Sequence, residues 1–313
     1  MTTEYTSMNR APHTLHEALD GEDFRARFEA TTGRSIVDLV DQFVEPAAPK
    51  AVFVAGSLTL GMGASGSDVD MIVLTDDRSA LKKGQTQVAN NAQELEFSSA
   101  SDLLLPGIFL TVNAGVLVDL HVAITPAIHR VYSRLRRRGP QLDETECRTL
   151  GRLQSAWLLY ESEGYMTDHS SLLSDPALPV YCCTRDFVSA LHQISKAERA
   201  LERHDIPLSL SHGRESVEYA YLAYFSSEGM TYLGSKWLAQ LGHARGAPER
   251  MQRHPLLAEG VPLLFPQYTT ENEQAATYLR QVAKFLTGLR KLIERKTLFR
   301  IALHACPQAH ALT

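Results

Sequence analysis

Residues 51–77 read AVFVAGSLTLGMGASGSDVDMIVLTDD, and the interpretation of the whole chain depends on them. The stretch begins with a short apolar run and continues through a loop rich in glycine and serine. It then returns to an apolar run that carries two aspartates at its start, Asp68 and Asp70. Short apolar runs bounded by glycines are typical of β-strands. We therefore expect two strands joined by a glycine-rich loop.

The Asp68–Asp70 pair needs a physical reason at the start of an apolar strand. Side chains two residues apart point to the same face of a strand, about 6.5–7 Å apart. Two bare carboxylates held there would repel each other and resist burial. Two divalent cations about 3.5–4 Å apart would accept this geometry and could hold a phosphoryl group. All-oxygen ligation favours Mg²⁺. The alternative is a turn-rich hairpin with two solvent-facing aspartates.

The order of these residues resembles the signature of the polymerase-β-like nucleotidyltransferases. In that superfamily a Gly-Ser pair ends one strand and Ser-Asp-x-Asp opens the next, as Gly56-Ser57 and Ser67-Asp68-Val69-Asp70 do here. The resemblance implies that Gly56, Ser57 and Ser67 belong to the nucleotide site and that ATP is a co-substrate. It also implies that Asp68 and Asp70 ligate Mg²⁺, together with a third carboxylate downstream on a neighbouring strand.

Asp119 is the candidate for that third carboxylate. It lies inside the apolar run VLVDLHVAI at residues 116–124, where a lone carboxylate is costly unless it is paired or binds a metal. A run at Ile108–Asn113 precedes it, and the short Asn/Gly-containing connection predicts a hairpin. His121 lies two residues on, on the same face. It would orient phosphate or substrate, or it is an ordinary histidine packed at the rim.

Composition sets the class of protein and its partners. The chain has 313 residues, a net charge of −5 and 44% hydrophobic residues, typical of a globular protein of one or two domains. The chain lacks the overall excess of basic residues that is typical of nucleic-acid-binding proteins, so a nucleic-acid partner is not expected. No run of 18 apolar residues predicts a membrane span, and the N-terminus lacks a secretory signal. Four scattered cysteines suggest reduced thiols, so we expect a cytoplasmic protein.

The downstream chain is predicted to be helical. Ser35 is a plausible N-cap for an earlier helix over 35–44. After residue 126, apolar spacing predicts helices at 144–160, 186–204, 216–241 and 271–295. The expected fold class is α+β, with a small mixed β-sheet catalytic domain over residues 1–126 and a helical bundle over 127–313. The first twelve or so residues are polar and expected to be loose.

Two segments of the helical part bear on phosphate binding. Residues 221–241, YLAYFSSEGMTYLGSKWLAQL, resemble more loosely the helical segment of streptomycin/spectinomycin-type aminoglycoside adenylyltransferases. Carried over, Lys236 would bind the nucleotide phosphates, although Glu228-Gly229 and Gly234 depart from the pattern; a surface lysine is the alternative. Five arginines within residues 130–138 form either a phosphate-facing patch or a solvated helix end.

Together these features predict a two-domain nucleotidyltransferase that moves AMP from ATP to a hydroxyl of a small molecule and releases pyrophosphate. Asp68 and Asp70 would hold two Mg²⁺ ions, with Asp119 beside the acceptor hydroxyl. An antibiotic or a natural-product intermediate would be the acceptor. One alternative is modification of a protein or tRNA, for which Arg199 and His204 offer an R-x4-H spacing. Another is a catalytically silent binding module. The acceptor, the preferred nucleotide and the oligomeric state stay open.

Overall fold

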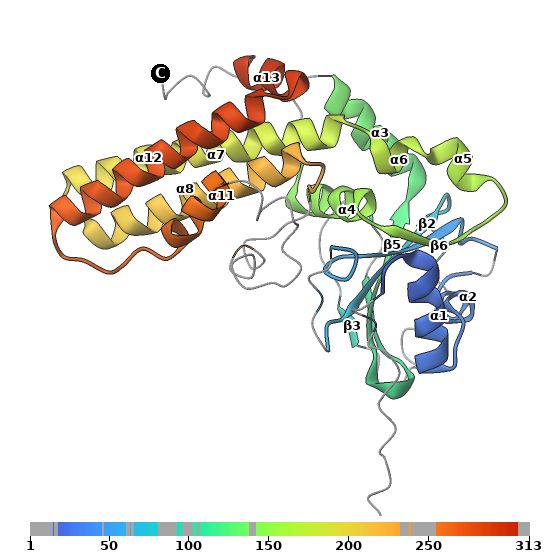
Figure 1. The fold of residues 1–313 in the computed structure, drawn as a ribbon. Coiled ribbons are helices and arrows are strands. Elements are labelled where there is room, and N and C mark those ends of the chain that lie inside the picture. Colours follow the sequence, from blue (N-terminus) through green and yellow to red (C-terminus); the bar gives the residue numbers. More distant parts are fainter. Residues whose placement is uncertain are drawn as a thin grey trace, which may run out of the picture. The chain divides into compact units, whose positions relative to one another are not determined.

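The computed structural model describes residues 15, 18–45, 47–60, 63, 66–80, 93–95, 103–104, 107–137, 142–231, 238 and 255–305. The chain divides into two compact units. The first contains Met1–Ile128 together with Ala156–Ser170, and the second contains His129–Ser155 together with Ser171–Thr313. The first unit holds the sheet and the second is built from helices (Figure 1).

A six-stranded mixed sheet forms the first unit, in the order β3-β4-β5-β2-β1-β6. Its strands are β1 (Ala51–Ala55), β2 (Val69–Thr75), β3 (Gln93–Leu95), β4 (Gly107–Thr111), β5 (Leu117–Ile124) and β6 (Trp157–Glu161). The central pair β2 and β5 is parallel, and the other neighbouring pairs are antiparallel. The predicted small mixed sheet followed by helices is confirmed.

Both predicted strand connections occur. β1 and β2 pair as antiparallel neighbours, so the glycine-rich segment between them is the connection of a strand pair. β4 and β5 also pair antiparallel, across a 3-10 turn η3 (Asn113–Gly115). Ala114 and Gly115 have positive φ angles of 63° and 73°, a conformation that reverses the chain sharply. The Asn113 side chain donates to the Thr32 carbonyl oxygen at 2.8 Å, which ties this turn to the preceding helix.

Two short helices pack on the sheet and bury its core. α1 (Gly21–Thr32) begins after Asp20, whose carboxylate accepts a hydrogen bond from the Asp23 amide, and α2 (Ile36–Asp41) begins after Ser35. The Ser35 hydroxyl accepts from the Asp38 amide at 3.0 Å, which confirms the predicted N-cap. The core contains these buried residues of α1, α2, β1, β2 and β5: Phe24, Phe28, Ile36, Leu39, Val52, Val54, Met71, Val73, Val118, Leu120 and Val122.

The helix predicted over 144–160 is wrong in its second half. α4 (Glu144–Gln154) ends at Ser155, and Trp157–Glu161 form strand β6 instead. β6 pairs antiparallel with β1, with Val54 opposite Trp157 and Val52 opposite Tyr160. Aromatic residues such as Trp157 and Tyr160 favour strands. The edge of β1 offers unpaired backbone N–H and C=O groups, and these residues pair with them. The spacing of apolar residues along the sequence carries no information about this edge.

The second unit is organised around a long helical hairpin. α7 (Ala177–Glu202) and α8 (Ile206–Ser227) pack against each other, and α12 (Asn272–Glu294) contacts both. The helices predicted at 186–204 and 271–295 are confirmed. The one predicted at 216–241 is helical to Ser227 and then runs into residues outside those described. Among the described residues, the other helical elements of this unit are α3 (Thr125–Arg136, which starts in the first unit), α4, α6 (Ser171–Ser174), α11 (Pro255–Gly260), η4 (Val261–Leu264) and α13 (Thr297–His304).

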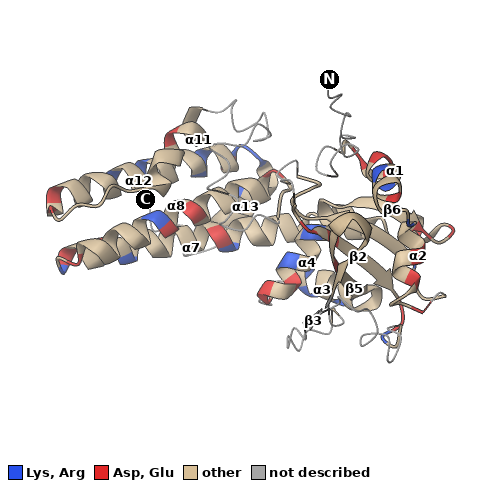
Figure 2. Ribbon diagram, turned by 90° about the horizontal axis from the view of Figure 1, so that it is seen from below, with Lys and Arg blue, Asp and Glu red and all other residues tan. Residues whose placement is uncertain are grey.

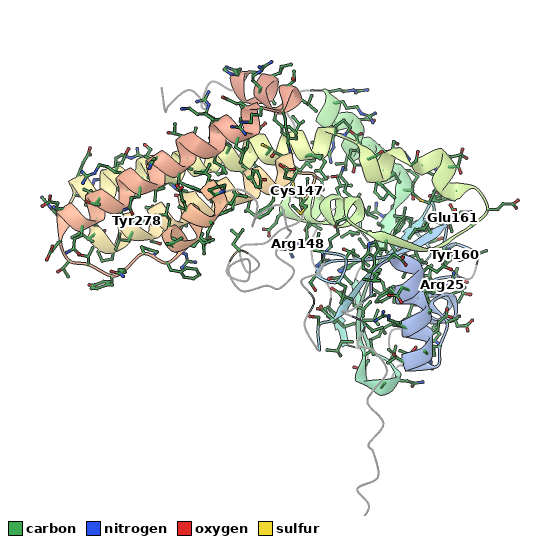
Figure 3. The ribbon with its side chains drawn as sticks, viewed as in Figure 1. Arg25, Cys147, Arg148, Tyr160, Glu161 and Tyr278 are labelled. Atoms are coloured by element: carbon green, nitrogen blue, oxygen red, sulfur yellow. The ribbon has the colours of Figure 1, made fainter. Side chains whose placement is uncertain are left out.

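A polar cluster of the exposed Arg185 with the buried Cys147 and Asp186 joins α4 to α7 inside the second unit. Cys147 of α4 accepts a hydrogen bond from the Arg185 guanidinium, with 3.1 Å between Nη1 and Sγ (Figure 3 labels Cys147). Arg185 also contacts the carboxylate of its neighbour Asp186 at 2.7 Å, and Asp186 is buried. A hydrogen bond from Cys182 and the nearby Arg185 cation lower the pKa of the Cys147 thiol. No described helix is long and apolar enough to cross a membrane.

Candidate metal centre

Asp70 and Asp119 lie directly opposite each other on the parallel strands β2 and β5. Asp70 opens β2 at its second residue, and Asp119 is the third residue of β5. Both side chains are buried, with residue exposures of 7% and 6%. Neighbouring positions in register share one face of a sheet, so the strand pairing holds two carboxylates side by side. Such a pair is costly unless a cation or a hydrogen-bond donor compensates it.

His121 completes a group of three possible ligands. Its Nε2 atom lies 2.9 Å from Oδ2 of Asp119, and its side chain is 13% exposed. One donor atom each from Asp70, Asp119 and His121 lie within 4.8 Å of one another. The other carboxylate oxygen of Asp119, Oδ1, is buried and accepts no hydrogen bond from the described residues. A buried acceptor beside a second carboxylate suits a divalent cation, so this group could hold a metal ion.

Gly56 brings the backbone against this group. It follows β1, whose last residue Ala55 pairs with Asp70, and it has a φ of +77°. A Cβ atom at Gly56 would lie only 2.8 Å from Cγ of Asp70. Glycine is therefore required both by the backbone conformation and by the space that the carboxylate occupies. The Thr59 hydroxyl donates to the Gly56 carbonyl at 3.1 Å, which closes the start of the loop, and Ser57 is buried within it.

The structure brings together some of the predicted site residues. Asp70 and Asp119 lie in one group and Gly56 lies against it. Ser67 and Asp68 precede β2 and are half-buried. Among the described residues, Asp68 is not part of the three-residue group. Lys236 lies outside the described residues. The contact between His121 and Asp119 was signalled in the sequence only by their i, i+2 spacing along a strand.

The arginines of α3 make ion pairs within the helical unit. Arg134 pairs with Glu146 and Arg136 pairs with Asp175, and both carboxylates belong to buried residues. These contacts supply a structural reason for two of the five arginines between 130 and 138. They use charges that a phosphate-facing patch would need.

The R-x4-H spacing of Arg199 and His204 does not form one site. Arg199 lines a hollow with Lys196 and Arg203, whereas His204 lines a different one, where its Nδ1 atom lies 2.5 Å from Nδ2 of Asn272. A pair of side chains that acts on one bond must converge on it. These two side chains line separate surfaces of the helical hairpin.

Comparison with known proteins gives little. No protein-family model and no curated protein matches the sequence. Among solved structures, the chain is similar to a nucleotidyltransferase-like protein from Exiguobacterium sibiricum 255-15, at 13% sequence identity and a TM-score of 0.41. The alignment covers 83% of this chain and 75% of that one. A likeness this slight transfers neither a site nor an activity.

Proposed function

We propose that this chain is a nucleotidyltransferase that transfers a nucleoside monophosphate, AMP from ATP, to a hydroxyl of a small molecule. The observation that carries the proposal is the register of β2 and β5, which sets Asp70 beside Asp119 under the Gly56 backbone. Two buried carboxylates and a glycine-rich connection combine a cation site with a loop that can approach phosphate. The Gly-Ser and Ser-Asp-x-Asp motifs support the same function.

The carboxylates would hold two Mg²⁺ ions. We assign Asp70 and Asp119 as ligands, with Asp68 at the entrance to β2 as the third. Bound there, the ions would neutralise the triphosphate and lower the pKa of the acceptor hydroxyl. The loop amides after β1, with Ser57 and Ser67, would contact the triphosphate oxygens. Lys236 would add a positive charge to the phosphates.

Asp119 has a second role in this proposal. Its Oδ2 atom contacts His121, and we assign its buried Oδ1 atom both to the cation and, as the acceptor hydroxyl reacts, to the proton of that hydroxyl. A carboxylate fixed through one oxygen presents the other in a defined direction, which favours proton transfer over a short distance. His121 is thus a positioning residue for Asp119.

We place the catalytic groups in residues 1–126 and a substrate-binding role in residues 127–313, which are helical apart from β6. The acceptor would be an antibiotic or a natural-product intermediate with a free hydroxyl. The buried free thiols of Cys147, Cys182 and Cys183 fit a reducing cytoplasm. A protein or tRNA acceptor is the second candidate.

Pyrophosphate release tests the proposal. Each of the four ribonucleoside triphosphates is incubated with the protein, Mg²⁺ and a panel of aminoglycosides, lincosamides and other polyols. Release that requires both ATP and one acceptor, and that is absent in Asp70→Asn and Asp119→Asn, supports it. If ATP binds but no small acceptor is modified, transfer from α-labelled ATP to protein or tRNA tests the second candidate. Failure to bind any nucleotide with Mg²⁺ would overturn both.

A further inference from the structure

A hollow between α7 and α8 is lined by basic side chains. It has a volume of about 450 Å³ and lies within the second unit. We call it the basic hollow, and its lining residues are Lys196, Arg199, Ala200, Arg203, Asp205, Leu208 and His212. Figure 2 shows blue Lys and Arg segments along these helices. None of these residues belongs to the candidate metal centre.

The three long cations come from one face of α7. Lys196, Arg199 and Arg203 are spaced i, i+3 and i+7, which aligns them along two turns, about 10 Å. Arg199 and Arg203 are exposed and Lys196 is half-buried. Like charges at these spacings destabilise a helix by themselves. An anionic ligand bound among them would offset this repulsion.

The described part of the chain does not supply that partner. None of the three cations has an acidic group within ion-pairing distance among the described residues. Other arginines of the same unit are paired, such as Arg214 with Glu218 at 2.9 Å and Arg290 with Glu294 at 2.7 Å. The cations of the basic hollow therefore keep their charge and their donors available.

Asp205, the acidic residue of the lining, has a structural role in α8. The Asp205 side chain is the N-cap of α8, and its Oδ1 atom accepts a hydrogen bond from the Leu208 amide at 3.2 Å. Its negative charge lies at the positive end of a 22-residue helix, which offsets it. Asp205 thus leaves the hollow with a net positive charge.

We propose that the basic hollow binds a ligand with two or more linked phosphate groups through Lys196, Arg199 and Arg203. Arginine forks bind phosphate oxygens in pairs, and a concave site presents several of them to one ligand. The span of the three cations suits a chain of phosphates better than a single anion. The described lining contains no Phe, Tyr or Trp on which a nucleic-acid base would stack, so recognition is by phosphate alone. This proposal does not depend on the proposed reaction.

Calorimetric titration of inorganic tripolyphosphate tests the site. The full chain carries Asp70→Asn and Asp119→Asn and is kept in EDTA, so that the candidate metal centre does not contribute. We expect binding with a Kd below about 1 mM that weakens about tenfold or more when Arg199→Gln and Arg203→Gln are added. Arg214→Gln together with Arg290→Gln is the matched control, because it removes the same two positive charges from helices of this unit outside the hollow and should change the Kd less than about twofold.

Three results would overturn the proposal: no tripolyphosphate binding in the parent, equal loss in the Arg214→Gln and Arg290→Gln control, or unchanged binding when Arg199→Gln and Arg203→Gln are added. A fourth would replace it, namely binding of single-stranded oligouridine without binding of tripolyphosphate, which would identify a nucleic-acid surface. Arg203→Lys keeps the charge and should retain most of the affinity. Far-ultraviolet circular dichroism and thermal unfolding of each variant separate loss of binding from loss of folding.

Discussion

Gly56 and Asp70 are packed so closely that no side chain fits between them. A Cβ atom on Gly56 would lie 2.8 Å from Cγ of Asp70, on a backbone already at a φ of +77°. The Asp70 carboxylate on β2 therefore restricts the first residue after β1 to glycine. This contact couples the position of the loop to the position of the proposed metal ligand.

Gly56→Ala should disable the candidate centre. The left-handed backbone conformation costs about 1–2 kcal/mol for alanine, and the added methyl must also displace the Asp70 carboxylate. We expect Mg²⁺ binding, followed by calorimetry, to weaken about tenfold or more. Gly33→Ala is the matched control, because Gly33 also has a positive φ of 66° but nothing lies within 4 Å of its Cβ position. It should lower stability by a similar strain cost and leave Mg²⁺ binding intact.

Asp70→Asn and Asp119→Asn should remove stabilisation by Mg²⁺ without harming the fold. Each replaces one of two adjacent buried carboxylates, which relieves repulsion in the metal-free protein. In EDTA their Tm should equal or exceed that of the wild type. Mg²⁺ at 100 times its Kd should stabilise the wild type by about 2.7 kcal/mol and therefore raise its Tm. It should not raise the Tm of either variant. Asp38→Asn, on the exposed first turn of α2, should respond like the wild type. A full Mg²⁺ response in both variants would contradict the ligand assignment.

Arg185→Gln should destabilise the second unit in a pH-dependent way. Burial already raises the pKa of the Asp186 carboxyl in the folded state, and loss of the guanidinium would raise that pKa further. A carboxyl whose pKa is higher when folded stabilises the fold at low pH, and this stability is lost as the pH rises through the folded pKa. Because the Arg185 side chain is 40% exposed and partly screened by solvent, we expect a cost of about 1–2 kcal/mol near neutral pH and a smaller cost near pH 5, measured by urea unfolding.

The control for this charge effect is Arg148→Gln. Arg148 pairs with Glu144 at 2.7 Å on the exposed side of α4, with both side chains more than half exposed (Figure 3 labels Arg148). Exposed pairs contribute about 0–1 kcal/mol, and this one should show little dependence on pH. A cost of Arg185→Gln that grows toward acidic pH would contradict the account of Asp186.

Tyr165→Phe should loosen the segment that follows β6. The Tyr165 hydroxyl lies 2.9 Å from Oδ1 of Asp76 and 2.7 Å from Oγ1 of Thr125, and it ties α5 (Tyr165–His169) to the ends of β2 and β5. Burial raises the pKa of this hydroxyl, so it stays protonated and can donate. We expect a loss of about 1–2 kcal/mol in the free energy of unfolding. Tyr160→Phe, whose hydroxyl makes no hydrogen bond among the described residues, should cost clearly less.

Local patterns predicted much of the fold. The strand character of residues 51–55 and 69–75, the β4–β5 hairpin and the Ser35 cap follow from spacing and turn chemistry, which act over a few residues. The neighbour of β2 does not follow from them; only the family resemblance implied that the strand of Asp119 lies beside it. The sequence placed Asp119 in a strand, but the parallel pairing that sets it opposite Asp70 joins residues 49 positions apart.

Three other features differ from the sequence prediction or go beyond it. Trp157–Glu161 continued an apparently helical pattern, and only the open edge of β1 decides that they form a strand. The contact between His121 and Asp119 depends on how two side chains turn on one face, which spacing alone leaves undetermined. Asp68, in the same motif as Asp70, also lies outside the three-residue group among the described residues.

The late arrival of β6 has a consequence for synthesis on the ribosome. The other five strands of the sheet are all synthesised by Ile124. The partner of β1 on its outer edge, Trp157–Glu161, is synthesised later, after α3 and α4. Until those residues emerge, the backbone donors and acceptors along one side of β1 have no strand to pair with and can recruit another chain. A pause in translation between residues 124 and 157 would prolong that exposure, so codon choice in this interval should affect the yield of native protein.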